Sequence, residues 1–144
     1  MARLSSAARY ALAFVAGFLS VLTFHQGALW LLHLFGVTSH HAWVIRPVPP
    51  FGIPAVFSLA FWGGLWGIVL IALVGRRKGW LLWFSATAVG AILPSIVAWF
   101  VVAPLEHQPI AGGGRPSAIL TALIINAAWG LGTAIFARGF GVRS

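Results

Sequence analysis

Three side chains that carry an imidazole or a carboxamide lie inside largely apolar stretches of this chain and are its first candidates for chemistry. His25 and Gln26 interrupt an apolar stretch at about residues 10–36, and Asn126 interrupts another at about residues 117–137. Imidazole and carboxamide groups are costly in an apolar medium unless other protein groups satisfy their hydrogen bonds. Such groups either serve a substrate or proton pathway or join helices as structural hydrogen bonds.

The positions of these three residues predict that they meet. If residues 10–36 form one membrane-spanning helix, His25 and Gln26 lie near its middle, at a depth comparable to that of Asn126. We therefore predict a hydrogen bond that joins His25 or Gln26 to a side chain of another stretch. The candidate partners are Asn126, Ser58, Ser95 and Thr121. A structural role is favoured over a proton pathway, because no carboxylate joins the group.

A second set of polar side chains falls beyond one end of the apolar stretches. It comprises His33, His40, His41, Glu106 and His107. Imidazole and carboxylate groups bind Zn²⁺ or Cu²⁺, so a metal site is one interpretation and a polar rim is the other. Haem is less favoured, because His25 and His33 lie on one stretch and cannot hold a single iron from both sides. Glu106, the only acid, is expected to pair with Arg46 or Arg115.

The sequence lacks the motifs that accompany common catalytic sites. It has no cysteine, which excludes disulfides, iron–sulfur clusters and thiolate chemistry. It contains no phosphate-binding loop, no G-x-S-x-G turn and no H-E-x-x-H helix. We therefore do not predict an enzyme.

The composition indicates an integral membrane protein. The 144 residues are 60% hydrophobic and 7% charged, whereas soluble domains carry about 25% charged residues. Lipid must cover part of so much apolar surface, and each long stretch reaches the roughly 20 residues that cross a bilayer. The four predicted spans are at about residues 10–36, 54–74, 80–103 and 117–137. Together they predict a single all-α domain over residues 1–144.

The basic residues predict the topology of this bundle. Seven fall on one side of the spans, namely Arg3, Arg9, Arg76, Arg77, Lys78, Arg138 and Arg143. Arg46 and Arg115 fall on the other side. The positive-inside rule then places both termini in the cytoplasm and gives an up-down-up-down bundle of four helices. Because the charges flank the spans, they indicate contact with the lipid bilayer and not with nucleic acid.

Small residues four positions apart predict where the helices pack closely. These pairs are Ala13 and Gly17, Gly63 and Gly67, Ala86 and Gly90, and Ala128 and Gly132. Packing within one chain is favoured, and homodimerisation through one of these faces is the alternative. A Trp-Gly pair recurs at residues 66–67 and 129–130, which raises the further alternative of two parallel hairpins related by duplication.

Several short phrases carry a resemblance that covers most of the chain. They are FHQG at 24–27, PPFGIP at 49–54, AFWGGLWG at 60–67, AWFVVAPL at 98–105 and WGLG at 129–132. Together they resemble small, uncharacterised four-span inner-membrane proteins of proteobacteria. This resemblance implies a bacterial inner (cytoplasmic) membrane and carries no activity. Small multidrug transporters fit less well, because they use a Glu in the first span that this chain lacks.

Three functions remain open from the sequence. The leading hypothesis is a non-enzymatic accessory or assembly subunit that packs against a larger membrane complex. The second is a small oligomeric transporter or channel whose polar site is formed by His25, Gln26 and Asn126. The third is metal or haem handling at the periplasmic face, through the histidines beyond the ends of the spans.

Overall fold

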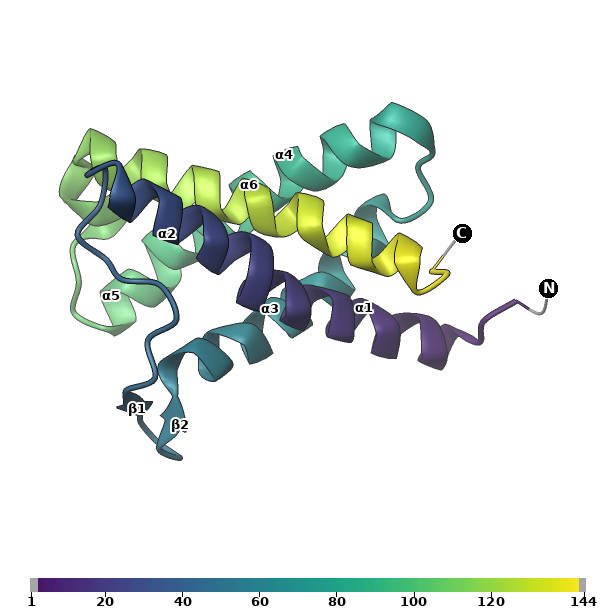
Figure 1. Cartoon of the computed structure of the whole chain (residues 1–144), viewed down its shortest axis with the longest axis horizontal. Coiled ribbons are helices and arrows are strands. Elements are labelled where there is room, and N and C mark those ends of the chain that lie inside the picture. The colour runs from purple at the N-terminus through teal and green to yellow at the C-terminus, as the bar shows by residue number, and fades with distance from the viewer. Residues whose placement is uncertain (1–2, 143–144) are drawn as a thin grey trace.

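The computed structural model describes residues 3–142, which form an arrangement of long helices joined by loops (Figure 1). The first helix comprises α1 (Ser6–Ser20), a π-helical segment (Val21–His25) and α2 (Gln26–Leu34). Two short strands follow, β1 (Pro47–Val48) and β2 (Ile53–Pro54), and then α3 (Ala55–Val74). The chain continues through α4 (Gly79–Val97), a second π-helical segment (Ala98–Val102), α5 (Ala103–Leu105), a 3₁₀ segment (Ile110–Gly114) and α6 (Pro116–Gly139).

Four continuous helices are long and apolar enough to cross a membrane. They are Ser6–Leu34, Ala55–Val74, Gly79–Leu105 and Pro116–Gly139. The structure thus confirms the all-helical class and the four candidate spans. The largest shift from the predicted bounds is at Ser6, four residues before the predicted start. It arises because the Ser5 hydroxyl caps the helix by accepting the Ala8 N–H at 3.1 Å.

Glycines in the left-handed conformation close two of these helices. Gly36 has a φ of 71° after α2, and the next residue, Val37, donates its N–H to the Leu32 carbonyl at 2.9 Å. The same arrangement follows α6 at Gly141, whose φ is 77°. Only glycine adopts this conformation without strain, so both helix ends are encoded locally.

The four long helices alternate in direction along one axis. Both ends of the described chain and the turn between α3 and α4 lie at one end of the molecule (Figure 1). Arg138 joins these parts, since its guanidinium donates to the carbonyls of Gly75 at 3.2 Å and Arg77 at 2.8 Å. Six of the seven basic residues predicted on one side therefore gather at this end; the seventh, Arg143, lies outside the described residues.

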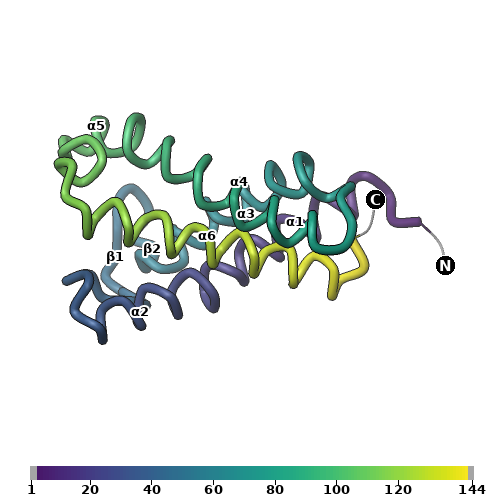
Figure 2. Tube along the Cα trace, turned by 90° about the horizontal axis from the view of Figure 1, so that it is seen from above, coloured from purple at the N-terminus to yellow at the C-terminus, as the bar shows by residue number. Residues whose placement is uncertain are grey.

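The helices pack in the spatial order α3, α1, α6, α4. The first helix contacts both α3 and α6, whereas α4 packs mainly against α6. Viewed from above, α6 lies between α4 and the first helix (Figure 2). Helices α1 and α6 therefore pack closely against each other, whereas α3 and α4 pack against each other only loosely.

Two helix crossings with the same local geometry hold the bundle together. At the α1–α3 crossing, a methyl group on Gly67 would lie 2.9 Å from the Cα of Gly17. At the α4–α6 crossing, a methyl group on Gly130 would lie 2.9 Å from the Cα of Gly90. An alanine carbonyl also faces the contact at each crossing. It belongs to Ala13, four residues before Gly17, at the α1–α3 crossing and to Ala86, four residues before Gly90, at the α4–α6 crossing. The α1–α3 and α4–α6 hairpins thus pack alike, as the duplication alternative predicts.

The remaining predicted packing glycines also face neighbouring helices. Gly63 of α3 lies against Val21 of the first helix. Gly132 of α6 lies against Phe24 and Ser20 of the first helix. Contacts within one chain therefore account for every glycine that the sequence singled out for packing.

A short hairpin connects the first helix to α3. Pro47 pairs with Pro54 in an antiparallel register, which gives β1 and β2. The N–H of Ala55 donates to the Arg46 carbonyl at 2.9 Å, and the N–H of Val56 donates to the Val44 carbonyl at 3.0 Å. These bonds satisfy donors of the first turn of α3 that have no partner within the helix.

Candidate functional site

Gln26 is the centre of a buried polar network in the first helix. It is 3% exposed, and its Oε1 accepts the backbone N–H of Trp43 at 2.7 Å. Its Nε2 lies 3.0 Å from Nδ1 of His25, which is also buried. The indole Nε1 of Trp43 donates to the Leu22 carbonyl at 2.8 Å. These four residues, here called the Gln26 network, join the first helix to the loop that follows it.

The π-helical segment Val21–His25 makes this network possible. A π-helical turn disturbs the regular hydrogen-bond pattern of a helix and can leave a carbonyl available to another donor. The Leu22 carbonyl lies in this segment and receives the indole of Trp43. Trp43 itself has a φ of 51°, which is unusual for a bulky residue. Its two hydrogen bonds to the first helix hold it in that conformation.

The same bonds define the protonation of the His25 ring. The N–H of Trp43 needs an acceptor, so the amide oxygen of Gln26 faces Trp43 and the amide nitrogen faces His25. An amide nitrogen can only donate, so Nδ1 of His25 accepts and the ring proton lies on Nε2. Both ends of the Gln26 amide are thus engaged in structural bonds.

The predicted bond between this pair and Asn126 is wrong. Among the described residues, Asn126 donates from Nδ2 to Oγ of Ser95 at 2.9 Å, which joins α6 to α4. Gln26 bonds to the loop instead, because it lies only eight residues before the end of α2 at Leu34. The helix extends further toward the N-terminus than predicted, so His25 and Gln26 are nearer its other end and within reach of Trp43.

Replacing Gln26 with leucine should release the loop. The change leaves the N–H of Trp43 without its acceptor, at a cost of about 1–3 kcal/mol. Hydrogen exchange followed by mass spectrometry should show faster exchange of residues 43–56 in Gln26→Leu than in the wild type. Gln108→Leu is the matched control, since Gln108 is exposed and its side chain makes no bond among the described residues. Equal exchange in the two variants would contradict the role of Gln26.

The five predicted metal ligands are only partly brought together. The rings of His33 and His41 lie 4.4 Å apart between centroids, and Nδ1 of His33 donates to the Thr38 carbonyl at 3.2 Å. Residues 3–142 contain no group of three or more histidine, cysteine or acidic side chains arranged to hold a metal ion. Two imidazoles are fewer than the three protein ligands of a catalytic zinc site.

The predicted ion pair of Glu106 is also wrong within the described chain. Arg115 directs its Nε to the Gly112 carbonyl at 3.0 Å and pairs with no carboxylate in residues 3–142. Glu106 follows α5 on an exposed turn, where solvent satisfies a single charge well. Arg115 therefore keeps its positive charge uncompensated beside the start of α6.

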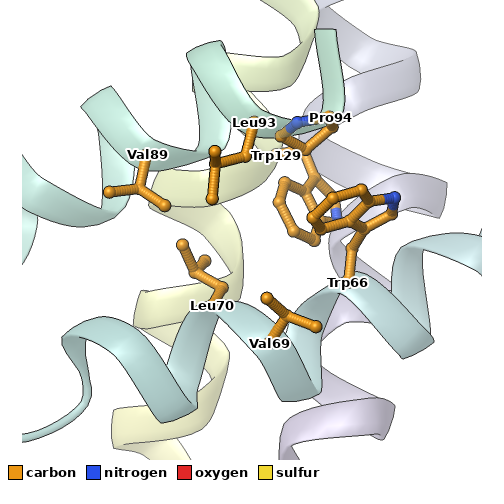
Figure 3. A pocket seen from close by; sticks show the side chains of 7 residues that line it. All are labelled: Trp66, Val69, Leu70, Val89, Leu93, Pro94 and Trp129. Atoms are coloured by element: carbon orange, nitrogen blue, oxygen red, sulfur yellow. The ribbon is translucent and has the colours of Figure 1, made fainter. Parts of the chain in front are cut away.

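A shallow apolar crevice, which has no room for a water molecule, lies between α3 and α4 and was not predicted. Val69 and Leu70 of α3 face Val89 and Leu93 of α4 across it (Figure 3). Trp66 and Trp129 lie side by side at one end of the crevice (Figure 3). The Trp-Gly repeat was the one sequence signal near the crevice, but a repeat does not predict which helix faces pack loosely.

The two tryptophans of the repeat have different surroundings. Trp129 is 3% exposed, and its Nε1 donates to the Gly17 carbonyl of α1 at 3.1 Å. The Ser20 hydroxyl donates to the Trp129 carbonyl at 2.7 Å, so α1 and α6 are bonded in both directions. Trp66 is half-buried, and its Nε1 has no acceptor among the described residues. The hydrogen bond from the indole of Trp129 in α6 to α1 therefore has no counterpart from Trp66 in α3 to α4 among the described residues.

No protein-family model, curated protein or solved structure matches this chain.

Proposed function

We propose that this protein is a non-enzymatic accessory or assembly subunit that packs against another subunit of a larger membrane complex. In this proposal a transmembrane helix of the partner packs against the outer faces of α3 and α4 on either side of the crevice. The observation that carries the proposal is that the two helical hairpins, α1–α3 and α4–α6, contact each other asymmetrically. The α1–α6 contact is complete, whereas the equivalent α3–α4 contact leaves the indole N–H of Trp66 without an acceptor.

The exposure of α4 supports the same proposal. In the long helix Gly79–Leu105, of which α4 is the first part, 11% of the residues in a hydrophobic 18-residue window are buried, against 28% to 39% in the other three long helices. Lipid alone can cover apolar side chains, but it offers no carbonyl deep in the acyl region for an indole N–H. A helix of another subunit offers both close packing and an acceptor such as a hydroxyl or a freed carbonyl.

The polar residues support a structural role over transport. The two groups proposed as a substrate site are separate: Gln26 bonds to His25 and Trp43, and Asn126 bonds to Ser95. A transport site needs polar groups that can exchange partners with a substrate. Here each amide joins two parts of the chain.

The proposed topology has four spans, with both termini in the cytoplasm of a bacterium and the loop that contains β1 and β2 outside. Support comes from the gathering of the described basic residues at the end that holds both termini and the α3–α4 turn. Protease or thiol-reagent access to tags placed before residue 3 and after residue 142 tests this directly. Tags reached from the periplasm would overturn the proposed orientation.

Photo-crosslinking in the native membrane tests the docking face. A photoreactive residue at Val69, which borders the crevice and is 42% exposed, should give one product whose second component is a defined membrane-spanning protein. Val15 of α1 is the matched control, because it is 41% exposed and lies outside the crevice. The same products from both positions, or products with lipid alone, would contradict the proposal.

A second variant tests the role of the Trp66 N–H. Trp66→Phe keeps an aromatic ring but removes the donor, so the yield of the Val69 product should fall about fivefold, equivalent to one hydrogen bond of ~1 kcal/mol. Trp62→Phe is the control, since Trp62 is on the same helix and 58% exposed. An unchanged yield in Trp66→Phe would show that the indole does not bond to the partner.

A further inference from the structure

Two histidines meet where α2 ends and the following loop begins. This is the end of the molecule opposite to the two termini (Figure 1). His33 belongs to the last turn of α2, and His41 belongs to the loop. The centres of their rings are 4.4 Å apart, and the ring planes are tilted by 48°. These two side chains, here called the histidine pair, belong neither to the Gln26 network nor to the α3–α4 crevice.

The ring of His33 is oriented with one nitrogen available. Its Nδ1 lies 3.2 Å from the Thr38 carbonyl, which can only accept, so the ring proton is on Nδ1 and the lone pair is on Nε2. Nε2 has no hydrogen-bond partner among the described residues. Histidines that bind metal ions almost always donate their other ring N–H in this way, because the bond orients the ring and raises the basicity of the free nitrogen.

The loop on both sides of His41 is held in place. Two residues later, Trp43 is bonded to the first helix through its backbone N–H and its indole. One residue earlier, the N–H of His40 donates to the Thr38 hydroxyl at 3.2 Å. His41 itself is exposed, and neither nitrogen of its ring has a hydrogen-bond partner in residues 3–142. The histidine pair therefore offers two uncommitted nitrogen ligands at a place that ions in solution can reach.

The distance between the two rings indicates which metal ion fits. Imidazole nitrogens lie about 2.0 Å from a bound metal ion, so two ring centres are roughly 4.5 Å apart at a right angle and roughly 5 Å apart at the tetrahedral angle. The observed 4.4 Å matches the right angle. Cu²⁺ prefers the right angles of square-planar or tetragonal geometry, whereas Zn²⁺ prefers tetrahedral geometry. Cu²⁺ also binds nitrogen ligands most tightly among the divalent first-row metals.

We propose that the histidine pair binds one Cu²⁺ ion, through Nε2 of His33 and a ring nitrogen of His41, with water in the remaining positions. His40 takes no part, because it lines a separate cavity at the start of α6 and its ring contacts no other ring in residues 3–142. The inference goes beyond the proposed subunit role and does not depend on it.

Titration of the untagged full-length protein in detergent tests the proposal with two metal ions. Isothermal titration calorimetry should show one saturable Cu²⁺ site per chain, and Zn²⁺ should bind to it at least about tenfold more weakly. Electron paramagnetic resonance of the Cu²⁺-loaded protein should show a tetragonal centre with nitrogen couplings from two imidazoles. Absence of a saturable Cu²⁺ site, a spectrum without imidazole nitrogen, or binding of Zn²⁺ as tight as that of Cu²⁺ would overturn the proposal.

Matched variants separate this site from binding by any exposed histidine. His33→Gln and His41→Gln each remove one ligand, so each should weaken Cu²⁺ binding at least about tenfold and remove one imidazole from the spectrum. His40→Gln removes the histidine next in sequence and should leave both the affinity and the spectrum unchanged. Circular dichroism should show the same helix content in all three variants, because none of these side chains is in the core. Equal losses of affinity in the three variants would indicate an adventitious ion only, and they would overturn the proposal.

Discussion

Replacing Gly130 with alanine should lower the free energy of unfolding by about 3 kcal/mol. The added methyl group would meet the Ala86 carbonyl and would lie 2.9 Å from the Cα of Gly90. Both neighbours are backbone atoms of α4, so no side chain can move aside, and α4 and α6 must separate. Denaturation in mild detergent by increasing amounts of dodecyl sulfate, followed by circular dichroism, measures this loss.

Gly27→Ala is the control for this prediction. Gly27 lies inside α2, and nothing is within 4 Å of where its methyl group would be. Alanine is the better helix former there, so this variant should be as stable as the wild type or more stable by about 0.5–1 kcal/mol. Equal stabilities of Gly130→Ala and Gly27→Ala would show that the α4–α6 crossing is not held by close backbone contact.

The second large effect is expected at Trp129, which packs between the two helical hairpins α1–α3 and α4–α6. Trp129→Ala removes a side chain that is 3% exposed and its bond to the Gly17 carbonyl, which should cost about 3 kcal/mol or more. Trp66→Ala removes the equivalent residue of the other hairpin, which is half-buried beside the crevice. We expect a loss of only about 1 kcal/mol there in the isolated protein, since little packing is removed.

Trp129→Phe separates the contributions of packing and of the hydrogen bond to the loss of stability in Trp129→Ala. The ring remains, and the bond from Nε1 is lost, so the expected cost is about 1 kcal/mol. The same dodecyl sulfate titration compares the three variants. If Trp66→Ala were as destabilising as Trp129→Ala, the two hairpins would meet equally in solution, and the asymmetry on which the proposed docking face rests would be wrong.

Much of the fold could be predicted from the sequence, because the signals are local. Uninterrupted apolar stretches, Ser5 before the first helix and Gly36 after it determine where that helix begins and ends. Small residues four apart also indicated close contacts at Gly17, Gly67 and Gly90, because the absence of a side chain there directly permits a close crossing. Gly130, which completes the α4–α6 crossing, was not in a predicted pair; Gly132 of the predicted pair faces the first helix instead.

The polar contacts could not be predicted to the same degree. The position of a residue along its helix predicts its depth in the bundle, but it does not predict which helix faces pack against each other. Gln26 and Asn126 each found a partner elsewhere, in Trp43 and Ser95. The bond to Trp43 requires a π-helical segment and a residue with positive φ in the loop, and neither has a distinct sequence signature.

The α3–α4 crevice was missed for a related reason. Trp66 and Trp129 occupy equivalent positions of two similar hairpins, so their sequence context predicts the same environment for both. Their difference depends on how the hairpins are placed relative to each other, which is determined by contacts between residues far apart in sequence, such as Ser20 with Trp129.

Native mass spectrometry of the tagged protein, gently extracted from its own membrane, tests the central claim most directly. If the protein is an accessory subunit, the spectrum should show a defined heteromeric mass that contains this chain and at least one other membrane-spanning chain. Trp66→Phe should reduce the share of that species, while Trp62→Phe should not. A spectrum that contains only the single chain or a bare homo-oligomer would contradict the account.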